Sequence, residues 1–215
     1  YKIPPATIKQ FNGAGVDSQA FAYIDRAEKP ELIIGMASRL LWPKGVGHFV
    51  EAVQMLKQKG INGIKCRFVL IGAPDEDNPY HVPPAQLQAW HDAGIIDYWG
   101  YKADMPDILA QLDILCLPTF YGEGVPKILI EGAATGLPLI AYNVAGCDVI
   151  IDNMQNGILV PPKNIQAIAQ AIVKLIKDSA LRLEMGKRGR AKIEQDFTAQ
   201  KINEETLLLW RELLA

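Results

Sequence analysis

The sequence predicts an α/β fold in which helices cover both faces of a Rossmann-like parallel sheet. Short apolar runs alternate along the chain with longer stretches in which apolar residues recur every three to four positions. Several of the short runs are apolar throughout, as in strands that are buried on both faces. With 215 residues, 49% of them hydrophobic, the chain is long enough for one domain with a sizeable core.

Each element is predicted from its own pattern. The expected strands are residues 32–37, 67–71, 95–99, 114–117 and 138–142, of which 95–99 and 138–142 are the weaker signals. Between the first two strands, Val46, Phe49 and Leu56 share one face of a helix that Gly60 ends. Further helices are expected after the capping residues Asp104 and Asn164, and at about 126–135, 179–195 and 198–214.

Composition excludes several classes of protein. The formal net charge of −2 argues against binding of nucleic acid through its phosphates, which requires a basic excess. No apolar run approaches the ~18 residues of a membrane span. The three cysteines, Cys66, Cys116 and Cys147, form no C-x-x-C pair, and the three histidines are too far apart for a zinc site. We therefore expect reduced thiols, a reducing cytoplasmic compartment and no bound metal.

Polar residues and glycines concentrate just after the predicted strands. In a parallel α/β sheet, ligands bind beyond the carboxyl ends of the strands. Arg39 and Lys44 follow the first strand and could neutralise a diphosphate. The alternative is a pair of solvated surface charges. Gly100 and Tyr101 follow a later strand at the same predicted edge.

Glu123 and Glu131 stand eight residues apart around a predicted helix start. Glu131 is expected almost two turns into that helix, roughly 9 Å along its axis. Two such acceptors suit an extended ligand with hydroxyls at both ends and a phosphate between them. The phosphate would meet the backbone N–H groups around Gly124 and Val125. The alternative is that Glu123 is only a favourable charge at a helix start and that Glu131 is a solvated helix residue.

These motifs resemble the donor site of family 4 glycosyltransferases of the GT-B fold. The matching segments are residues 35–46 (GMASRLLWPKGV), 99–106 (WGYKADMP) and 117–138, which contains both glutamates. Residues 12–17 (NGAGVD) resemble the segment that leads into the second domain of that family. Gly132, where the family usually has Ala, and the Ala14–Gly15 pair are small departures. The resemblance covers nearly the whole chain and is closest to bacterial enzymes that build surface polysaccharides or lipid-linked oligosaccharides.

The resemblance implies a role for each candidate residue. Arg39 and Lys44 would neutralise the leaving diphosphate, and Glu123 would hold hydroxyls of the donor sugar with the amides of Gly124 and Val125. Glu131 would accept hydrogen bonds from the ribose. The backbone near Gly100 and Tyr101 would meet the base. Such enzymes transfer sugar from a nucleotide-diphosphate sugar with retention of configuration and without a metal; we expect a UDP-sugar, with a GDP-sugar as the alternative.

The resemblance implies that residues 1–215 provide one nucleotide-sugar-binding domain, the C-terminal half of a GT-B enzyme. Residues 1–30 would lead in from an N-terminal domain that carries the glycan or lipid-linked acceptor, and part of the helix at 198–215 would pack toward it. We therefore expect weak nucleotide binding and little sugar transfer by this chain alone. The full enzyme is expected in the cytoplasm, either free or bound peripherally to the inner face of the cytoplasmic membrane. The alternative is a stand-alone nucleotide-sugar-binding module that acts with a separate partner chain.

Three other motifs give competing interpretations. The sequence Asp75-Glu76-Asp77 is a D-x-D pattern that holds a metal in another glycosyltransferase fold, although a solvated acidic turn is the commoner explanation. Residues 45–50 partly match G-x-G-x-x-G but lack the third glycine. The basic cluster at 187–192 could face anionic lipid, whereas most such clusters are solvated helix faces.

Overall fold

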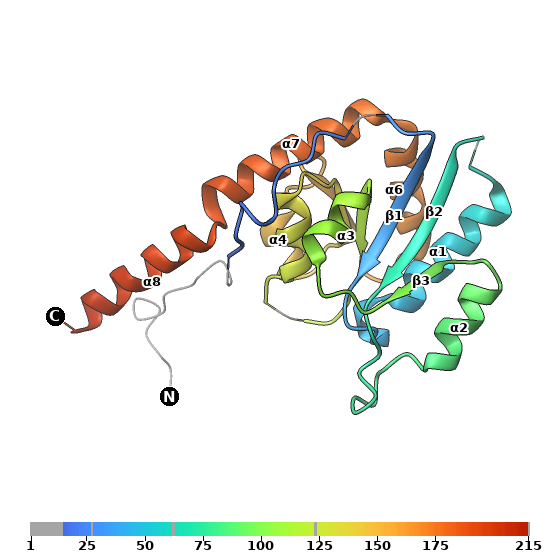
Figure 1. The fold of residues 1–215 in the computed structure, drawn as a ribbon, viewed down its shortest axis with the longest axis horizontal. Coiled ribbons are helices and arrows are strands. Elements are labelled where there is room, and N and C mark those ends of the chain that lie inside the picture. Colours follow the sequence, from blue (N-terminus) through green and yellow to red (C-terminus); the bar gives the residue numbers. More distant parts are fainter. Residues whose placement is uncertain (1–14, 27, 62, 123, 215) are drawn as a thin grey trace.

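The computed structural model describes residues 15–26, 28–61, 63–122 and 124–214. Within them the chain forms a six-stranded parallel sheet with the order β3-β2-β1-β4-β5-β6 (Figure 1). The strands are β1 (Glu31–Ala37), β2 (Lys65–Ile71), β3 (Asp97–Gly100), β4 (Ile114–Leu117), β5 (Leu139–Tyr142) and β6 (Gly157–Val160). The strand order reverses between β1 and β4, so the carboxyl ends of these two strands flank the switch point where such sheets bind ligands.

Helices connect and cover the strands, which confirms the predicted Rossmann-like fold. They are α1 (Val46–Lys59), α2 (Pro84–Asp92), α3 (Met105–Gln111), α4 (Lys127–Ala134), α5 (Cys147–Ile150), α6 (Ile165–Lys177), α7 (Ser179–Asp196) and α8 (Ala199–Leu214), with a short 3₁₀ turn η2 (Trp42–Lys44) before α1. The Asp104 and Asn164 side chains cap α3 and α6 as predicted, because each accepts a hydrogen bond from a first-turn backbone N–H.

All five predicted strands are confirmed to within two residues at each end. The sequence pattern missed β6, α2 and the one-turn helix α5. β6 has four residues and begins at Gly157, which is a poor strand former. α2 lies beyond the long loop after β2 and buries only Leu87, so it lacks the apolar periodicity that indicates a helix.

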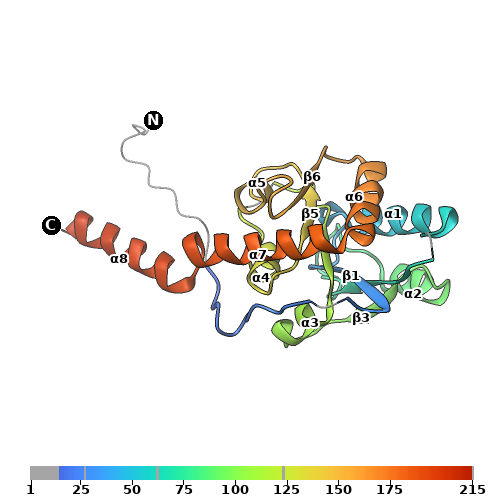
Figure 2. The same ribbon diagram turned by 90° about the horizontal axis from the view of Figure 1, so that it is seen from above.

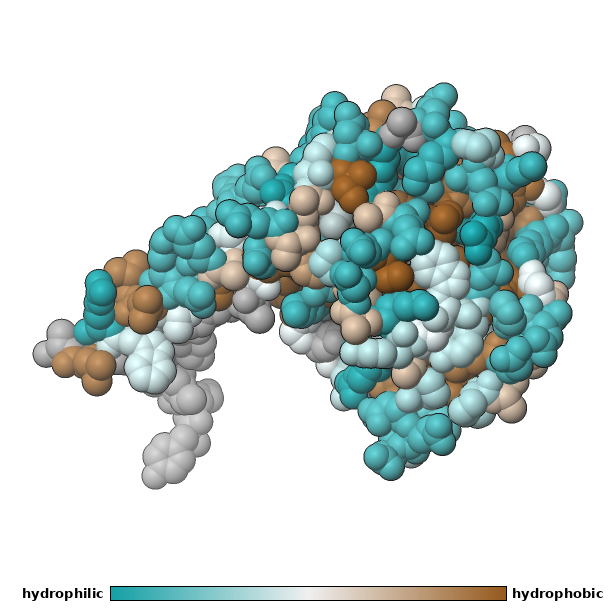
Figure 3. Space-filling model, viewed as in Figure 1, coloured by the Kyte–Doolittle hydropathy of each residue, from teal (hydrophilic) through white to brown (hydrophobic). Residues whose placement is uncertain are grey.

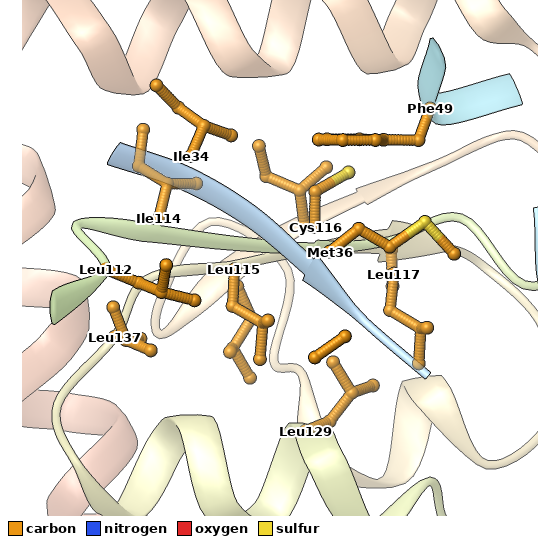
Figure 4. Close-up of a cluster of buried hydrophobic side chains, with 14 of the residues drawn as sticks. Ile34, Met36, Phe49, Leu112, Ile114, Leu115, Cys116, Leu117, Leu129 and Leu137 are labelled. Carbon is orange, nitrogen blue, oxygen red and sulfur yellow. The ribbon is translucent and has the colours of Figure 1, made fainter. Parts of the chain in front are cut away.

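The core lies on both faces of the central strands. In Figure 4, Ile34 and Cys116 project from the sheet toward Phe49 of α1, whereas Leu115 projects toward Leu129 of α4. All five side chains are fully buried. Burial also raises the pKa of the Cys116 thiol, which keeps it protonated and inert. Because both faces are covered, the edge at the carboxyl ends of the strands is where the sheet can meet a ligand.

The segment at 15–26 has little regular structure but is tied firmly to the domain. The Arg26 guanidinium donates hydrogen bonds to the backbone carbonyls of Leu109, Leu112 and Thr135. Burial lowers the pKa of Arg26 to about 10, against the opposing effect of Asp113. Arg190 of α7 forms a second clamp, donating to the carbonyls of Ser18, Phe21 and Ala134. The two arginines thus join this segment to the ends of α3 and α4.

The last helix, α8, projects away from the body of the domain (Figures 1 and 2). Apolar side chains are exposed toward its far end (Figure 3): Leu207, Leu208, Trp210 and Leu214. The expectation that part of this helix packs on another domain stays a prediction. In the part of the chain that the structure describes, none of the helices combines the length and the apolar character needed to span a bilayer.

Candidate functional site

A cleft of about 530 Å³ opens at the carboxyl edge of the sheet, where β1 and β2 end. Its walls include Arg39, Gly72, Tyr101, Met105 and Ile128, which come from five different segments. This volume falls within the roughly 300–1,000 Å³ of small-molecule sites. The cleft therefore lies where the fold class predicts a ligand, and Arg39 and Tyr101 line it as the sequence suggested.

Close backbone contacts hold the floor of this cleft. Gly72, directly after β2, has φ +135°, and a Cβ at this position would lie 1.9 Å from the carbonyl oxygen of Ser38. Its N–H donates to the carbonyl of Gly100 over 2.9 Å, and its own carbonyl accepts from the Tyr98 hydroxyl at 3.2 Å. A side chain at Gly72 would push the ends of β1 and β2 apart.

Arg39 is the first cation that follows β1 along the chain. Its side chain is 64% exposed, and its Nη1 lies 3.2 Å from the Asp75 carboxylate. A solvent-exposed pair of this kind is worth about 0–1 kcal/mol. Asp75 therefore contacts Arg39 at the edge of the cleft but binds it too weakly to prevent it from binding an anionic ligand.

The turn that carries Lys44 is locked against β4. Gly45 follows with φ +84°, and a Cβ there would lie 1.9 Å from the carbonyl oxygen of Pro118. The backbone N–H of Phe120 donates to the carbonyl of Pro43 over 3.1 Å. These contacts hold Lys44 beside the segment after β4.

Lys44 lines a second cavity, which has a volume of about 230 Å³ and shares Arg39 with the cleft. The second cavity is lined by Arg39, Leu41, Pro43, Lys44, Asn78, Pro79, Tyr80 and Tyr121. The two cations predicted to act on a diphosphate thus line one continuous edge of the sheet. Tyr80 and Asn78 were not predicted as site residues.

Helix α4 begins at Lys127, directly after Pro126, and none of the described side chains caps its first turn. Uncapped N–H groups at a helix start favour an anion. The two residues predicted to contribute amides precede this start: Gly124 is exposed and Val125 is half-buried. Glu123 lies outside the described residues, so its predicted role stays a prediction.

Glu131 lies just over one turn into α4, not almost two as predicted, because the helix begins later than the sequence indicated. The interpretation as a solvated helix residue is wrong, since Glu131 is only 7% exposed. Among the described residues, the partner of its carboxylate is Lys127, whose Nζ lies 3.4 Å from Oε1. Ile128, which lines the cleft, is three residues before Glu131 and shares its helix face.

Burial raises the pKa of Glu131 above its ordinary value, and the Lys127 ammonium only partly opposes this shift. A buried carboxylate is costly unless it is paired and hydrogen-bonded. Lys127 is itself largely exposed and supplies a single contact. A ligand that donates hydrogen bonds from hydroxyl groups would stabilise the charged form.

The structure also gathers an aromatic cluster at this edge that sequence reasoning missed. The His48 Nδ1 lies 3.1 Å from the Tyr142 hydroxyl, and the His48 ring lies 5.0 Å from that of Phe120. Lys163 places its Nζ 5.2 Å from the Phe120 ring centre. His48 lies in the first turn of α1, Tyr142 ends β5, Phe120 follows β4, and Lys163 follows β6, which was itself not predicted.

The D-x-D pattern and the partial G-x-G-x-x-G motif are both engaged within the fold. Asp75 pairs with Arg39, as described above. Across the described residues, no group of three or more His, Cys, Asp or Glu side chains is placed to hold a metal ion. Gly45 and Gly47 belong to the turn before α1 and to its first residues, where they serve backbone packing.

The basic cluster at 187–192 is used within the fold. Arg188 pairs with Glu184 at 2.7 Å, and Arg190 pairs with Glu194 at 2.6 Å besides donating to the backbone carbonyls. Lys192 pairs with Asp152 at 2.8 Å. These ion pairs favour a structural role over binding to anionic lipid.

Comparison with known proteins assigns the chain to a family. The model of the family "Glycosyl transferases group 1" matches residues 31–178. An N,N'-diacetylbacillosaminyl-diphospho-undecaprenol α-1,3-N-acetylgalactosaminyltransferase of Campylobacter jejuni is 33% identical over 155 residues, which cover 72% of this chain and 38% of that protein. The chain spans 38% to 50% of the length of the first curated relatives that it matches.

Solved structures show the same domain. The C-terminal domain of a group 1 glycosyl transferase, LpcC of Francisella tularensis, is 28% identical with a TM-score of 0.70, and the match covers 86% of this chain and 99% of that one. HepE of Anabaena, solved in complex with UDP-glucose, is 19% identical with a TM-score of 0.76, over 92% of this chain and 56% of that one, and shares the fold. The chain therefore belongs to the group 1 glycosyl transferases and has the fold of their C-terminal domain.

Proposed function

We propose that this domain binds the nucleotide-diphosphate sugar of a retaining glycosyltransferase in the synthesis of a bacterial surface polysaccharide or lipid-linked glycan. The observation that carries the proposal is the gathering of Arg39 and Lys44 at the switch point of the sheet, beside a cleft large enough for a nucleotide. As the glycosidic bond breaks, negative charge develops on the departing diphosphate. Fixed cations and the first-turn amides of α4 stabilise that charge.

The buried carboxylate of Glu131 supplies the second anchor. In this proposal the Glu131 carboxylate accepts hydrogen bonds from the ribose hydroxyls. Among the described residues only Lys127 contacts this carboxylate, so the ribose would supply the hydrogen bonds that it lacks. The base lies toward Gly100 and Tyr101, of which Tyr101 lines the cleft. Glu123, Gly124 and Val125 hold the donor sugar, a role that rests on the resemblance of residues 117–138 to the family's motif.

The relatives support a UDP-sugar donor and a lipid-linked acceptor. The Campylobacter relative is named for transfer of N-acetylgalactosamine to a sugar on diphospho-undecaprenol, and HepE was solved with UDP-glucose. We extend both features to this chain as a proposal. The acceptor binds a second domain, so the 215 residues alone bind the donor weakly and transfer little sugar. Robust transfer by the purified chain would overturn that part.

Calorimetry with UDP, GDP and ADP tests the donor site. We expect UDP to bind most tightly, and Glu131→Ala to weaken it about tenfold or more through the lost ribose hydrogen bonds. Glu204→Ala is the matched control, because Glu204 is an exposed helical glutamate on α8. Tighter binding of GDP would refute the choice of base, and unchanged UDP affinity in Glu131→Ala would remove Glu131 from the site.

A further inference from the structure

Helices α1 and α6 pack side by side on one face of the sheet (Figure 2). A groove of about 190 Å³ lies between them and shares no lining residue with the two cavities at the carboxyl edge. We propose that this α1/α6 face binds an anionic membrane surface and that the groove takes the headgroup of one acidic phospholipid. This lipid site is separate from the donor site, so either can fail without the other.

The two helices carry a positive charge that the rest of the chain does not share. α1 contains Lys57, Lys59 and Glu51, whereas α6 contains Lys174 and Lys177 and no acidic residue. Four lysines and one glutamate give the two helices a net charge of +3, with histidine neutral, although the whole chain has −2. Glu51 lies eight residues before Lys59, about 12 Å along the helix axis. The positive charge is therefore concentrated toward the C-terminal ends of both helices.

The groove combines an apolar floor with polar groups that the fold does not use. Its lining includes Met55, Lys59, Gln166, Gln170 and Val173. Lys177 lies four residues after Val173, so it continues the same stripe of α6. The ammonium groups of Lys59 and Lys177 form no ion pair with any side chain that the structure describes. Within the same described ranges, the side-chain amides of Gln166 and Gln170 make no hydrogen bond.

These groups match a phosphate ester on a short apolar stem. The Lys59 ammonium pairs with the phosphate as a point charge, and the two glutamine amides donate N–H groups to its oxygens. Met55 and Val173 are half-buried, so they offer apolar surface to the glycerol and the first methylenes of the lipid. Lys177 reaches the phosphate of a neighbouring lipid. Each lysine near an acidic surface strengthens binding about fivefold.

The residue types of the α1/α6 face favour a lipid surface over a protein partner. Interfaces between proteins are enriched in Tyr, Trp and Arg and depleted in Lys. α1 and α6 contain no Tyr, Trp or Arg, and all four of their basic residues are lysines. Clusters of four or more basic residues on a helical face are typical of binding to acidic lipids. The basic cluster at 187–192 differs, because its arginines and Lys192 form ion pairs within the fold.

Interaction with the helix dipole is the other physical reason for lysines in a last helical turn. It explains their position along each helix but not around it. Lys57 lies two residues before Lys59 in the last turn of α1, on the other side of the helix, and donates a hydrogen bond to the carbonyl of Gly94. A change at Lys57 therefore alters the dipole interaction and the net charge as a change at Lys59 does, without touching the groove.

Co-sedimentation with vesicles tests the lipid site, using phosphatidylcholine alone or with one third phosphatidylglycerol. We expect the chain to bind the acidic vesicles and to be released at high salt. The double variant Lys59→Gln/Lys177→Gln should bind them roughly tenfold or more weakly and keep its affinity for UDP. The matched control is Lys57→Gln/Lys187→Gln, which removes the same charge outside the groove, since Lys187 is exposed on α7. Its vesicle affinity should fall less than about threefold.

Gln170→Glu places a carboxylate on the groove wall at an exposed helical position, so the fold should be retained, which thermal melting checks. It should weaken binding to acidic vesicles, whereas Gln58→Glu, exposed on α1 outside the groove, should have a smaller effect. Equal binding to both kinds of vesicle, or equal weakening in the two double variants, overturns the lipid site. So does an absence of vesicle binding, and binding of poly-glutamate through Lys59 and Lys177 would then indicate an acidic protein partner. Lysine-dependent vesicle binding by a chain that does not bind UDP would support the lipid site and refute the donor site.

Discussion

Gly45→Ala tests the contact that joins the Lys44 turn to β4. At φ +84° a residue with a Cβ adopts the left-handed conformation at a cost of about 1–2 kcal/mol. The new Cβ would also lie 1.9 Å from the carbonyl oxygen of Pro118, a backbone atom that cannot rotate away. Forcing packed segments apart typically costs a further 1–3 kcal/mol, so we expect about 2–5 kcal/mol of destabilisation.

Gly94→Ala is the matched control for this substitution. Gly94 has φ +64°, and a Cβ there would meet no atom within 4 Å. It therefore carries the conformational cost of about 1–2 kcal/mol without the collision. For a domain of this size, 1 kcal/mol corresponds to roughly 2–4 °C in Tm, so we expect a loss of about 4–20 °C for Gly45→Ala and about 2–8 °C for Gly94→Ala.

Differential scanning fluorimetry measures both Tm values, and calorimetry well below the unfolding transition measures UDP affinity. Displacement of the turn moves Lys44, so Gly45→Ala should weaken UDP while Gly94→Ala leaves it unchanged. Equal losses of Tm in the two variants would show that the contact with Pro118 carries no energy. Wild-type UDP affinity in a destabilised Gly45→Ala would separate the turn from the donor site.

Three further outcomes are expected. Burial raises the folded-state pKa of Glu131 above its ordinary 4.5, so its ionised form costs stability above that folded pKa. Glu131→Gln should therefore raise Tm at neutral pH, with the gain disappearing as the pH falls below 4.5; a gain that grows in acid would contradict this. In α7, Gly186→Ala should destabilise the fold, because the new Cβ would lie 2.2 Å from the Gly136 carbonyl oxygen. Gly189→Ala, whose Cβ would lie 3.6 Å from its nearest neighbour, should stabilise the fold by up to about 1 kcal/mol. Denaturant unfolding that ranks the two variants in the reverse order would refute this. Arg39→Gln should weaken UDP roughly tenfold and reduce the salt dependence of its affinity, measured calorimetrically at two ionic strengths, and an unchanged salt dependence would exclude contact with the phosphates.

Elements with a long or strongly periodic apolar pattern could be predicted from the sequence, whereas β6 and α2, which lack such a pattern, could not. β1 is apolar from Leu32 to Ala37, and α6 repeats its apolar residues with helical spacing behind the Asn164 cap. β6 is held by pairing with β5, and α2 buries a single leucine, so neither has a strong local pattern.

The same distinction applies to the site. Arg39 and Lys44 could be predicted because they directly follow a recognisable strand. Tyr80 could not be, because backbone hydrogen bonds between residues 38–42 and 73–82 place it beside them. Glu131 was identified by its motif, but its burial depends on tertiary packing, which composition does not encode.

The arginine clamps have a practical consequence for anyone who shortens this chain. A version that began at β1 would keep every strand and helix of the domain. It would nevertheless lack Arg26, so the carbonyls at the ends of α3 and α4 would lose their guanidinium donor. Arg190 would lose two of its three carbonyl acceptors. Expression trials should therefore start upstream of residue 15, because the cooperative unit of folding is larger than the secondary structure suggests.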